Sequence, residues 1–532
     1  MNKRILLLLA AANISFLSAG YAAESPAECF LQAEKNGWQA QSAFRHCMNF
    51  VYGWLGHRDP ATGLIPRNLS QSFFWNAQDS AADNYPFMVL TCAMLNRELF
   101  ETTMKRMLET EIRLTNRLDN LPDDYDFAKQ GFRMPEIDLA RLIFGGSEYV
   151  KDGLIPLTEW LGESPWTERM QGIEDSIWKH APLDTPFGKI PSDSHEINGE
   201  QLQVLCRLYW MHKMEKYREW AFRLADYYFL EHLPTDSEDL RLDDHGCEVV
   251  DGLAGAYYLA VHTDPQRRER YREPMHRMID RILEVGINED GLVYEAINPK
   301  TGEIKRKALS DNWGYNYNAI LNAAQLDGVE RYRQAVEHLL KQIWKNRDYP
   351  WEGGGSDGYA DAIEGGLNLL NWIPLESGFQ WVDYSIEIML NKQRPDGVIE
   401  GWHGDGNYAR TALMYALWKT QGVYVNPWRA DLCFGSVERD GVLYLVLRGD
   451  WNWSGEVIFD PPRHKEFFNL PSDYPRINQF PEWFTVAAAS EYNVQIDSEE
   501  VMRKKGSELQ KGLRIKIDAK KPCYINLRNI EQ

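Results

Sequence analysis

The feature that most constrains the fold is a recurring pair of predicted helices, repeated at a spacing of about 45 to 60 residues, which is typical of helical repeats. Each unit begins with a polar, glycine-rich or acidic loop, continues into an apolar helix and returns through a charged amphipathic helix. A weaker unit covers 134–145 and 165–180, and a helix over 407–420 ends the series. The clear pairs are 80–97 with 98–115, 196–211 with 214–231, 245–261 with 267–285, 312–324 with 329–346, and 357–372 with 377–391.

The two helices of each pair differ in their polarity. Segment 245–261, HGCEVVDGLAGAYYLAV, is apolar or small around most of its circumference, as expected of a helix surrounded by protein. Segment 267–285 has a single apolar stripe among charged residues, which is typical of a helix that faces water. Alternating buried and exposed helices predict a mainly α protein, an (α/α)6-7 toroid or barrel. An open solenoid of helices is the alternative, but it gives the inner helices no reason to be apolar on all sides.

The pattern changes near Asp431. Strand-like runs occur at 441–447, 455–459, 513–517 and 523–527, separated by turn residues. They predict a C-terminal antiparallel β-sandwich over 429–532, behind a toroid domain over 24–428. Two domains also suit a chain of 532 residues, which exceeds what one core usually supports. A hairpin over 292–305 is expected in a loop at the rim of the toroid.

The first residues have the pattern of a secretory signal peptide. Lys3 and Arg4 precede a short apolar run, and small residues up to Ala23 precede a polar break at Glu24. We therefore expect cleavage of 1–23 and a periplasmic (Gram-negative type) or extracellular mature protein. A buried N-terminal helix is the alternative. No later segment is long and apolar enough to predict a membrane span.

Composition narrows the range of partners. The formal net charge of −20 argues against nucleic acid, whose phosphates need clustered Lys and Arg, although a local basic pocket for an anionic sugar is compatible with it. The 19 Trp and 26 Tyr suit a large core and also a cleft for a flat, polar ligand such as a sugar. The sequence does not predict the oligomeric state.

The seven cysteines are scattered, without a CxxC motif or zinc-type spacing. Disulfides between Cys29 and Cys47, or between Cys433 and Cys523, are conceivable in an oxidising compartment.

The loops that precede the inner helices should surround one cavity, because in a closed ring these helices all start on the same face. Capping explains Asp193, Ser310 and Ser356. It does not explain histidines, tryptophans and deeper acids in the same loops, so we expect a functional cavity there. The candidate catalytic residues are Glu248, Glu196, Asp357, Asp244, His245, Asp311 and Asp83. The candidate substrate-binding residues are Trp75, Tyr85, His195, Asn312, Trp313, Tyr315, Trp402, His403, Arg67 and Arg410.

No metal or cofactor is predicted. Asp244, His245 and Glu248 can share one helix face, but a metal site needs three or four ligands and no HExxH motif is present. Phosphate-loop, dinucleotide and GxSxG signatures are absent as well.

The loop phrases SAADNYPFMV, LDDHGCEVV and SDNWGYNYN make the chain resemble the six-hairpin carbohydrate-active enzymes, and most of all glycoside hydrolase family 154. The six-hairpin enzymes also include unsaturated uronyl hydrolases and many polysaccharide lyases. The resemblance implies a glucuronidase-type activity on an oligosaccharide or polysaccharide that contains uronic acid. It transfers no catalytic residue.

Three functions then compete. A hydrolase needs a carboxylic acid and a second carboxylate, for which Glu248 with Glu196 or Asp357 are the first choices. A lyase needs a Tyr or His base and groups that neutralise the uronate carboxylate, for which His245, His195, Tyr315 and Asn312 are available. In either case Arg67 or Arg410 would bind the uronate. A glycan-capture protein without catalysis is the third possibility. The surplus of acids in the loops favours the hydrolase.

Overall fold

The computed structural model describes residues 25–70 and 73–530. The predicted signal peptide, 1–23, lies outside these residues. None of the helices in the described part of the chain is long and apolar enough to cross a membrane.

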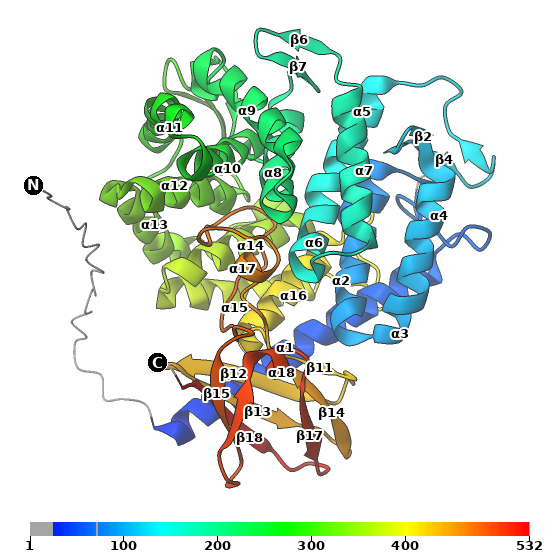
Figure 1. Cartoon of the computed structure of the whole chain (residues 1–532), viewed down its shortest axis with the longest axis vertical. Helices are drawn as coiled ribbons and strands as arrows, with labels where there is room; N and C mark the ends of the chain where they lie inside the picture. The colour runs from blue at the N-terminus through cyan, green and yellow to red at the C-terminus, as the bar shows by residue number, and fades with distance from the viewer. Residues whose placement is uncertain (1–24, 71–72, 531–532) are drawn as a thin grey trace, which may run out of the picture.

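The chain is a mainly helical α/α toroid followed by antiparallel β-sheets, as the sequence predicts (Figure 1). Within the described residues, seven inner helical segments pack side by side, and the ring closes where the last one packs against the first. The inner segments are η1 (Ala77–Asn84) with α2 (Tyr85–Leu95), α5 (Leu139–Glu148) with η3 (Tyr149–Leu154) and α6 (Ile155–Leu161), α8 (His195–His212), α10 (Cys247–Thr263), α12 (Trp313–Asp327), α14 (Ser356–Trp372) and α16 (Asn407–Thr420).

The outer helices carry the amphipathic sequences. Their buried stripes cover the inner helices, while their charged faces meet water. They are α1 (Pro26–Gly56), α3 (Arg97–Leu99) with η2 (Phe100–Met104) and α4 (Lys105–Thr115), α7 (Pro165–Lys179), α9 (Glu215–Leu230), α11 (Pro265–Val285), α13 (Glu330–Gln342) and α15 (Glu376–Leu390).

One helix has other bounds than predicted, and another helix is not predicted at all. Helix α5 begins at Leu139 rather than at residue 134, because the Asp138 side chain caps it by accepting from the Arg141 amide. It then continues through π-helical η3 into α6 and ends at Leu161. Helix α1 is not among the predicted helices. Ser25 caps its first turn, and Glu28 completes the capping box.

Helix α1 joins the ring to the sheets. It packs against α16 on one side and against β12 (Cys433–Arg439) on the other. Asn36 donates to the carbonyl of Ser436 at 2.8 Å. A Cβ atom on Gly435 would lie 2.1 Å from the Gly37 nitrogen, so helix and strand meet through bare backbone. Figure 1 shows α1 running between the ring and the sheets below it.

The C-terminal region contains two antiparallel sheets. One has the order β11 (Tyr424–Asn426), β14 (Trp453–Ile458), β17 (Leu513–Ile517). The other has the order β12, β13 (Val442–Arg448), β18 (Cys523–Asn529), β15 (Glu491–Ile496), β16 (Met502–Lys505). Alternate residues of β17, Leu513, Ile515 and Ile517, are buried, as the period-two pattern predicts.

Short β-hairpins decorate the rim of the ring. The predicted hairpin is present as β9 (Tyr294–Asn298) and β10 (Glu303–Leu309), with β8 (Leu240–Arg241) beside β9. The other rim strands are β1 (Phe74–Trp75), β4 (Tyr125–Asp126) and β5 (Gly131–Phe132), β2 (Asn116–Leu118) with β3 (Leu121–Pro122), and β6 (Leu183–Thr185) with β7 (Gly188–Ile190). Short helical turns complete the description: η4 (Pro234–Asp236), η5 (Ile343–Asn346), η6 (Trp351–Gly354), α17 (Arg463–Glu466) and α18 (Gly506–Leu509).

Neither of the conceivable disulfides forms. Cys29 and Cys47 lie on the same helix, roughly 27 Å apart at 1.5 Å per residue. Cys433 on β12 and Cys523 on β18 are separated by strand β13, and both are reduced.

A long segment between β14 and β15 leaves the sheets and enters the ring. Residues 472–479, here called the floor segment, contact inner helices from the side opposite to their N-termini. Arg476 pairs with Glu159 of α6 at 2.9 Å, Arg207 of α8 donates to the carbonyl of Ile477, and Tyr258 of α10 donates to the carbonyl of Ser472. The ring is therefore closed below by the C-terminal region.

Candidate active site

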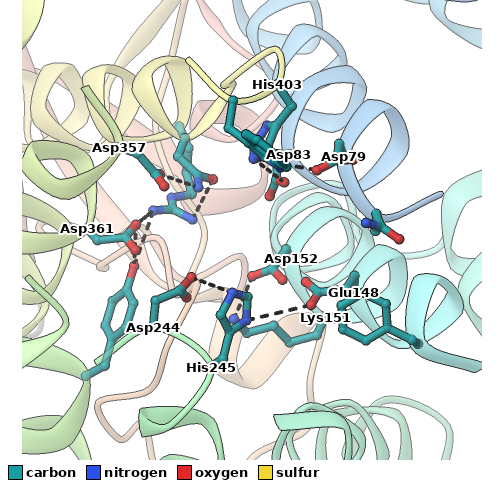
Figure 2. Close-up of a pocket in the computed structure, with 16 residues that line it drawn as sticks. Asp79, Asp83, Glu148, Lys151, Asp152, Asp244, His245, Asp357, Asp361 and His403 are labelled. Carbon is teal, nitrogen blue, oxygen red and sulfur yellow. Dashed lines mark hydrogen bonds and ion pairs between the residues drawn. The ribbon is translucent and has the colours of Figure 1, made fainter. Parts of the chain in front are cut away.

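One cavity opens among the N-terminal ends of the inner helices (Figure 2). It holds about 770 Å³ of space including its open mouth. Its lining is mostly charged and comprises Gln78, Asp79, Asp83, Phe144, Glu148, Lys151, Asp152, Asp244, His245, Tyr315, Asp357, Asp361, Trp402, His403, Asn407 and Arg410.

Two π-helical segments build one wall of the cavity. Segment η1 carries Asp79 and Asp83, segment η3 carries Lys151 and Asp152, and the two segments pack against each other. π-Helical turns inside α-helices are rare and often occur at functional sites. Here η1 leads directly into α2 and η3 connects α5 to α6, and both carry polar side chains that line the cavity.

Asp83 lies beside His403, whose Nε2 atom is 3.6 Å from Asp83 Oδ2 and 3.7 Å from Asp79 Oδ1. Burial raises the pKa of Asp83 well above its ordinary value, and the nearby Asp152 and Asp79 add to this although His403 opposes it. Asp79 is held on its other side by Arg67, at 2.5 Å. The protonated form of Asp83 is therefore favoured relative to an ordinary aspartate.

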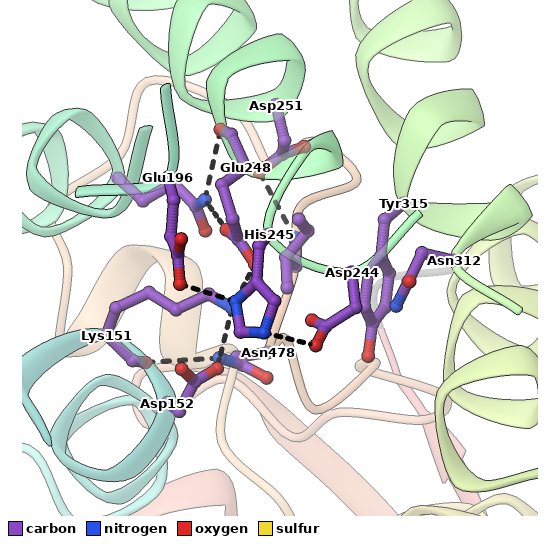
Figure 3. A network of polar contacts seen from close by, with 12 residues as sticks. Lys151, Asp152, Glu196, Asp244, His245, Glu248, Asp251, Asn312, Tyr315 and Asn478 are labelled. Atoms are coloured by element: carbon purple, nitrogen blue, oxygen red, sulfur yellow. Dashed lines mark hydrogen bonds and ion pairs between the residues drawn. The ribbon is translucent and has the colours of Figure 1, made fainter. Parts of the chain in front are cut away.

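Asp244 is the opposite case (Figure 3). Its side chain lies inside the ring but is 55% accessible to cavity water, and its Oδ2 atom is 2.9 Å from His245 Nε2. Enclosure by the ring opposes ionisation, but the charge and hydrogen bond of His245, together with Lys151 and Arg241, lower the pKa of Asp244. Asp244 is thus an ionised carboxylate, in the same cavity as Asp83, whose pKa is shifted in the opposite direction.

His245 is fixed between two acids. Its Nδ1 atom is 2.5 Å from Glu196 Oε1, while Nε2 contacts Asp244. Burial opposes protonation, but these two carboxylates raise the pKa of His245 to about 12. The backbone of His245 has a φ of 67°, a left-handed conformation that is rare for residues other than glycine and clusters at functional sites. The imidazolium is therefore permanent at neutral pH.

Glu248, the first choice for the acid, lies beneath the cavity wall. It is 2% exposed, pairs with Lys151 and accepts a 2.5 Å hydrogen bond from Gln203. Burial raises its pKa to about 7 although Lys151 opposes this. Lys151 also pairs with Asp152 at 2.6 Å. Glu248 is not among the lining residues, so its place in the structure suits the fixing of Lys151 better than contact with a substrate.

Arg410 forms a buried cluster on the facing wall. It is 2% exposed and lies 2.6 Å from both Asp361 and Glu364. Its Nη2 atom donates to the Tyr315 hydroxyl at 3.2 Å, and its Nη1 atom donates to Asn478 Oδ1 at 3.1 Å. Because two carboxylates already neutralise this guanidinium, little of its charge is left for a ligand.

Asp357 completes the lining on the same side. Asn407 donates to its Oδ1 atom at 2.9 Å. Burial raises the pKa of Asp357 well above its ordinary value, and the charges of Asp405 and Asp361 contribute further. The protonated form is favoured for Asp357 as it is for Asp83.

The structure brings together many of the predicted site residues but not all of them. Eight line the cavity: Asp83, Asp244, His245, Asp357, Tyr315, Trp402, His403 and Arg410. Glu196 does not line the cavity but pairs with His245, which does. Arg67 likewise contacts two lining residues, Asp79 and the ring of Trp402.

The other predicted residues serve packing or local bonding. Trp75, Tyr85 and Trp313 belong to the buried core, where Tyr85 bonds to the carbonyl of Met104 and Trp313 packs edge-on against Trp381. His195 packs against Tyr228. Asn312 donates to Asp361, and Asp311 accepts from the Asn312 amide.

Several residues of this site are not among the candidates from the sequence: Gln78, Asp79, Phe144, Glu148, Lys151, Asp152, Asp361 and Asn407 in the lining, and Asn478 beneath it. Glu148 ends α5, and Lys151 and Asp152 lie in η3, so attention to the loops before helices could not find these three. The adjacent charges Lys151-Asp152 in an otherwise apolar run are a signal that was available. Nothing in the sequence connects Asn478 to the ring.

Some of these acids have the geometry of metal ligands. Ligand atoms of Asp79, Asp83 and His403 lie within 4.8 Å of one another, as do those of Glu148, Glu196 and His245, and those of Glu148, Asp152 and Glu200. These groups could hold a cation. The same oxygens are occupied by ion pairs with Arg67, His245 and Lys151.

Comparison with known proteins assigns no family. No protein-family model and no curated protein matches the chain. An α-1,6-mannanase from Salegentibacter sp. HEL1_6 matches with 12% identity and a TM-score of 0.40, over 70% of this chain and 98% of that one. The unsaturated glucuronyl hydrolase from Bacillus sp. GL1 matches with 13% identity and a TM-score of 0.37, over 53% and 85%.

A possible member of the GH105 family from Salmonella enterica serovar Paratyphi A matches with 15% identity and a TM-score of 0.41, over 59% and 93%. At such identities the likeness concerns the arrangement of helices. The resemblance to glycoside hydrolase family 154 stays a prediction.

Proposed function

We propose that the chain is a glycoside hydrolase in which Asp83 is the general acid and Asp244 the general base or nucleophile. The observation that carries this proposal is the opposite shift of two carboxyl pKa values in one cavity, raised for Asp83 and lowered for Asp244. Glycoside hydrolysis requires such a pair, one group to protonate the leaving oxygen and one to act on the sugar or on water.

The state of His245 favours hydrolysis over β-elimination. An elimination needs a neutral base to remove the proton beside the uronate carboxylate. With a pKa of about 12, His245 stays protonated at neutral pH and cannot act as that base. Burial also raises the pKa of Tyr315 well above its ordinary value, although Arg410 opposes this. The two lyase candidates of this kind that line the cavity, His245 and Tyr315, are therefore both protonated at neutral pH, and His195 does not line the cavity.

We further propose that the glycan contains a uronic acid and that His403 binds its carboxylate. The pKa of His403 is raised because Asp83 and Asp79 outweigh the effect of burial. Its contacts with these acids are long, at 3.6 and 3.7 Å, whereas Lys151 and Arg410 form close pairs. Among these basic side chains of the lining, His403 therefore has the longest contacts with acids and is the least closely paired. The N-terminal pattern of 1–23 supports export of this activity.

Incubation with a panel of uronate-containing and neutral oligosaccharides tests the proposal. Reducing ends and the ultraviolet absorbance of a conjugated uronate are followed together, with Asp244→Asn as the matched negative control. New reducing ends without new absorbance are expected for the wild type alone. New absorbance would establish elimination instead, and binding without turnover would establish glycan capture.

A further inference from the structure

The cavity has a closed lower end. Asn478 of the floor segment is fully buried, and its backbone amide donates to Glu364 at 2.8 Å. Its side chain accepts from Arg410 at 3.1 Å and donates to the carbonyl of Lys151 at 3.1 Å. Glu364, Arg410 and Lys151 belong to three different inner segments, so this residue bridges the ring directly below the cavity. Figure 3 shows Asn478 beside Lys151. A glycan chain cannot thread through the ring.

The open end leads into a second groove. Gln78 and Trp402 line both the cavity and this groove, which holds about 1,280 Å³ of space including open solvent. The Gln78 side chain makes no hydrogen bond to any other residue in the described part of the chain, so its amide is free to bond a ligand at the junction.

Trp402 stands at this junction as an exposed ring. It is 72% exposed, although large aromatic side chains are usually mostly buried. The Arg67 guanidinium lies 5.1 Å from the ring centroid, and Arg67 is itself fixed by Asp79. The indole is thus supported from the protein side. A ring that is apolar, flat and held in place suits stacking against the apolar face of a pyranose.

The groove beyond Trp402 combines a few exposed apolar side chains with charged residues of both signs. Met134 and Ile137 are 51% and 49% exposed there. Arg133 and Arg141 both pair with Asp124, at 3.4 and 2.8 Å. Paired charges beside apolar side chains offer hydrogen bonds without a net field, which suits a neutral sugar better than a charged one.

We infer that this groove is a second sugar subsite, and that the protein takes oligosaccharides with the chain end in the cavity and a neutral pyranose on Trp402. The inference rests on the proposed function. It also places the scissile bond at the junction of cavity and groove, next to Asp83, because Asp79, Asp83, Trp402 and His403 share this rim. Action from the chain end follows from the closed floor.

Calorimetric titration of the Asp244→Asn protein with monosaccharides and with the matching di- and trisaccharides of the same panel tests the subsite. At least one disaccharide is expected to bind tenfold or more tightly than its terminal monosaccharide. Trp402→Ala in the same background should remove most of this advantage, whereas Trp451→Ala, which removes another exposed tryptophan far along the chain, should keep it. Equal affinity of mono- and disaccharides throughout, or an advantage that survives Trp402→Ala, would overturn the inference.

The products of the wild-type protein separate this inference from the proposed function. A tetrasaccharide substrate is expected to release the terminal monosaccharide first. Release of internal fragments would contradict chain-end binding while leaving hydrolysis intact. Loss of all turnover with a disaccharide advantage still present would contradict the proposed function and leave the subsite standing.

Discussion

Two carboxyl groups with different surroundings account for the chemistry proposed at the residue scale. Asp83 sits among other acids in a buried wall, whereas Asp244 touches an imidazolium and lies near Lys151 and Arg241. Burial disfavours the charged form of a carboxyl group, and a nearby cation favours it. The pKa of the same chemical group is therefore raised on one side of the cavity and lowered on the other.

Asp83→Asn should lower kcat/KM on natural glycans by about 10²- to 10⁴-fold, because the amide cannot protonate the leaving oxygen. A general acid must be protonated, so wild-type activity should fall as pH rises through the raised pKa of Asp83. The variant should lose this alkaline limb and retain more activity on a glycosyl fluoride, whose leaving group needs little protonation. The pH profile of kcat/KM checks both effects.

Asp311→Asn is the control for that substitution. Burial raises the pKa of Asp311 as well, with the charge of Asp361 adding to the shift, but Asp311 does not line the cavity. An equal loss of activity in both variants would contradict the role of Asp83.

His245→Gln should move the acid limb of the pH profile to higher pH. Removing the imidazolium takes away the main cation that holds Asp244 ionised, so the pKa of Asp244 rises and activity is lost at a higher pH on acidification. His195→Gln, which alters a histidine packed against Tyr228, should leave the limb in place. An unchanged acid limb in His245→Gln would contradict the account of Asp244.

At the element scale, inner segments that contain π-helical turns shape the site. Segments η1 and η3 place Asp83 and Asp152 in the lining, the loops before α10 and α16 supply Asp244 and His403, and α14 supplies Asp357. A ring of helices thus presents polar side chains from far-apart parts of the sequence at one end.

Gly435→Ala should destabilise the protein by about 1–3 kcal/mol, because the added methyl group meets the backbone of α1 at Gly37 and cannot be relieved by a side-chain rotation. Gly56→Ala, at the end of the same helix with open space around it, should change stability by less than about 1 kcal/mol. Urea denaturation midpoints measure both. Equal midpoints would show that α1 and β12 do not meet as closely as described.

The sequence predicts the repeating helical pairs because their apolar and amphipathic patterns persist over many residues. It also leads to Asp83, Asp244 and His403, since polar residues before inner helices collect at one end of a ring. Trp75 and Trp313 belong to the same loops and are therefore predicted to bind substrate. They fill the space between inner and outer helices instead. The repeat pattern does not predict α1, because this helix is not followed in the sequence by the helix that it pairs with in the ring, α16.

At the scale of the whole molecule, the C-terminal region and the ring complete each other. The floor segment closes the ring through Arg476, Ile477 and Asn478, and no local pattern in the sequence predicts that 472–479 would lie among helices. Such contacts depend on the folded arrangement of the entire chain. A cavity that is open at one end and closed at the other is the result.

The most direct test of the central claim is kcat/KM of Asp244→Asn on the best glycan of the panel, with the folded state checked by circular dichroism and thermal unfolding. The substitution preserves the shape of the side chain and removes the negative charge of Asp244. The account predicts a loss of at least about 100-fold with an unchanged fold. Activity within tenfold of the wild type, in a correctly folded variant, would contradict a catalytic role for Asp244 and with it the proposed carboxylate pair.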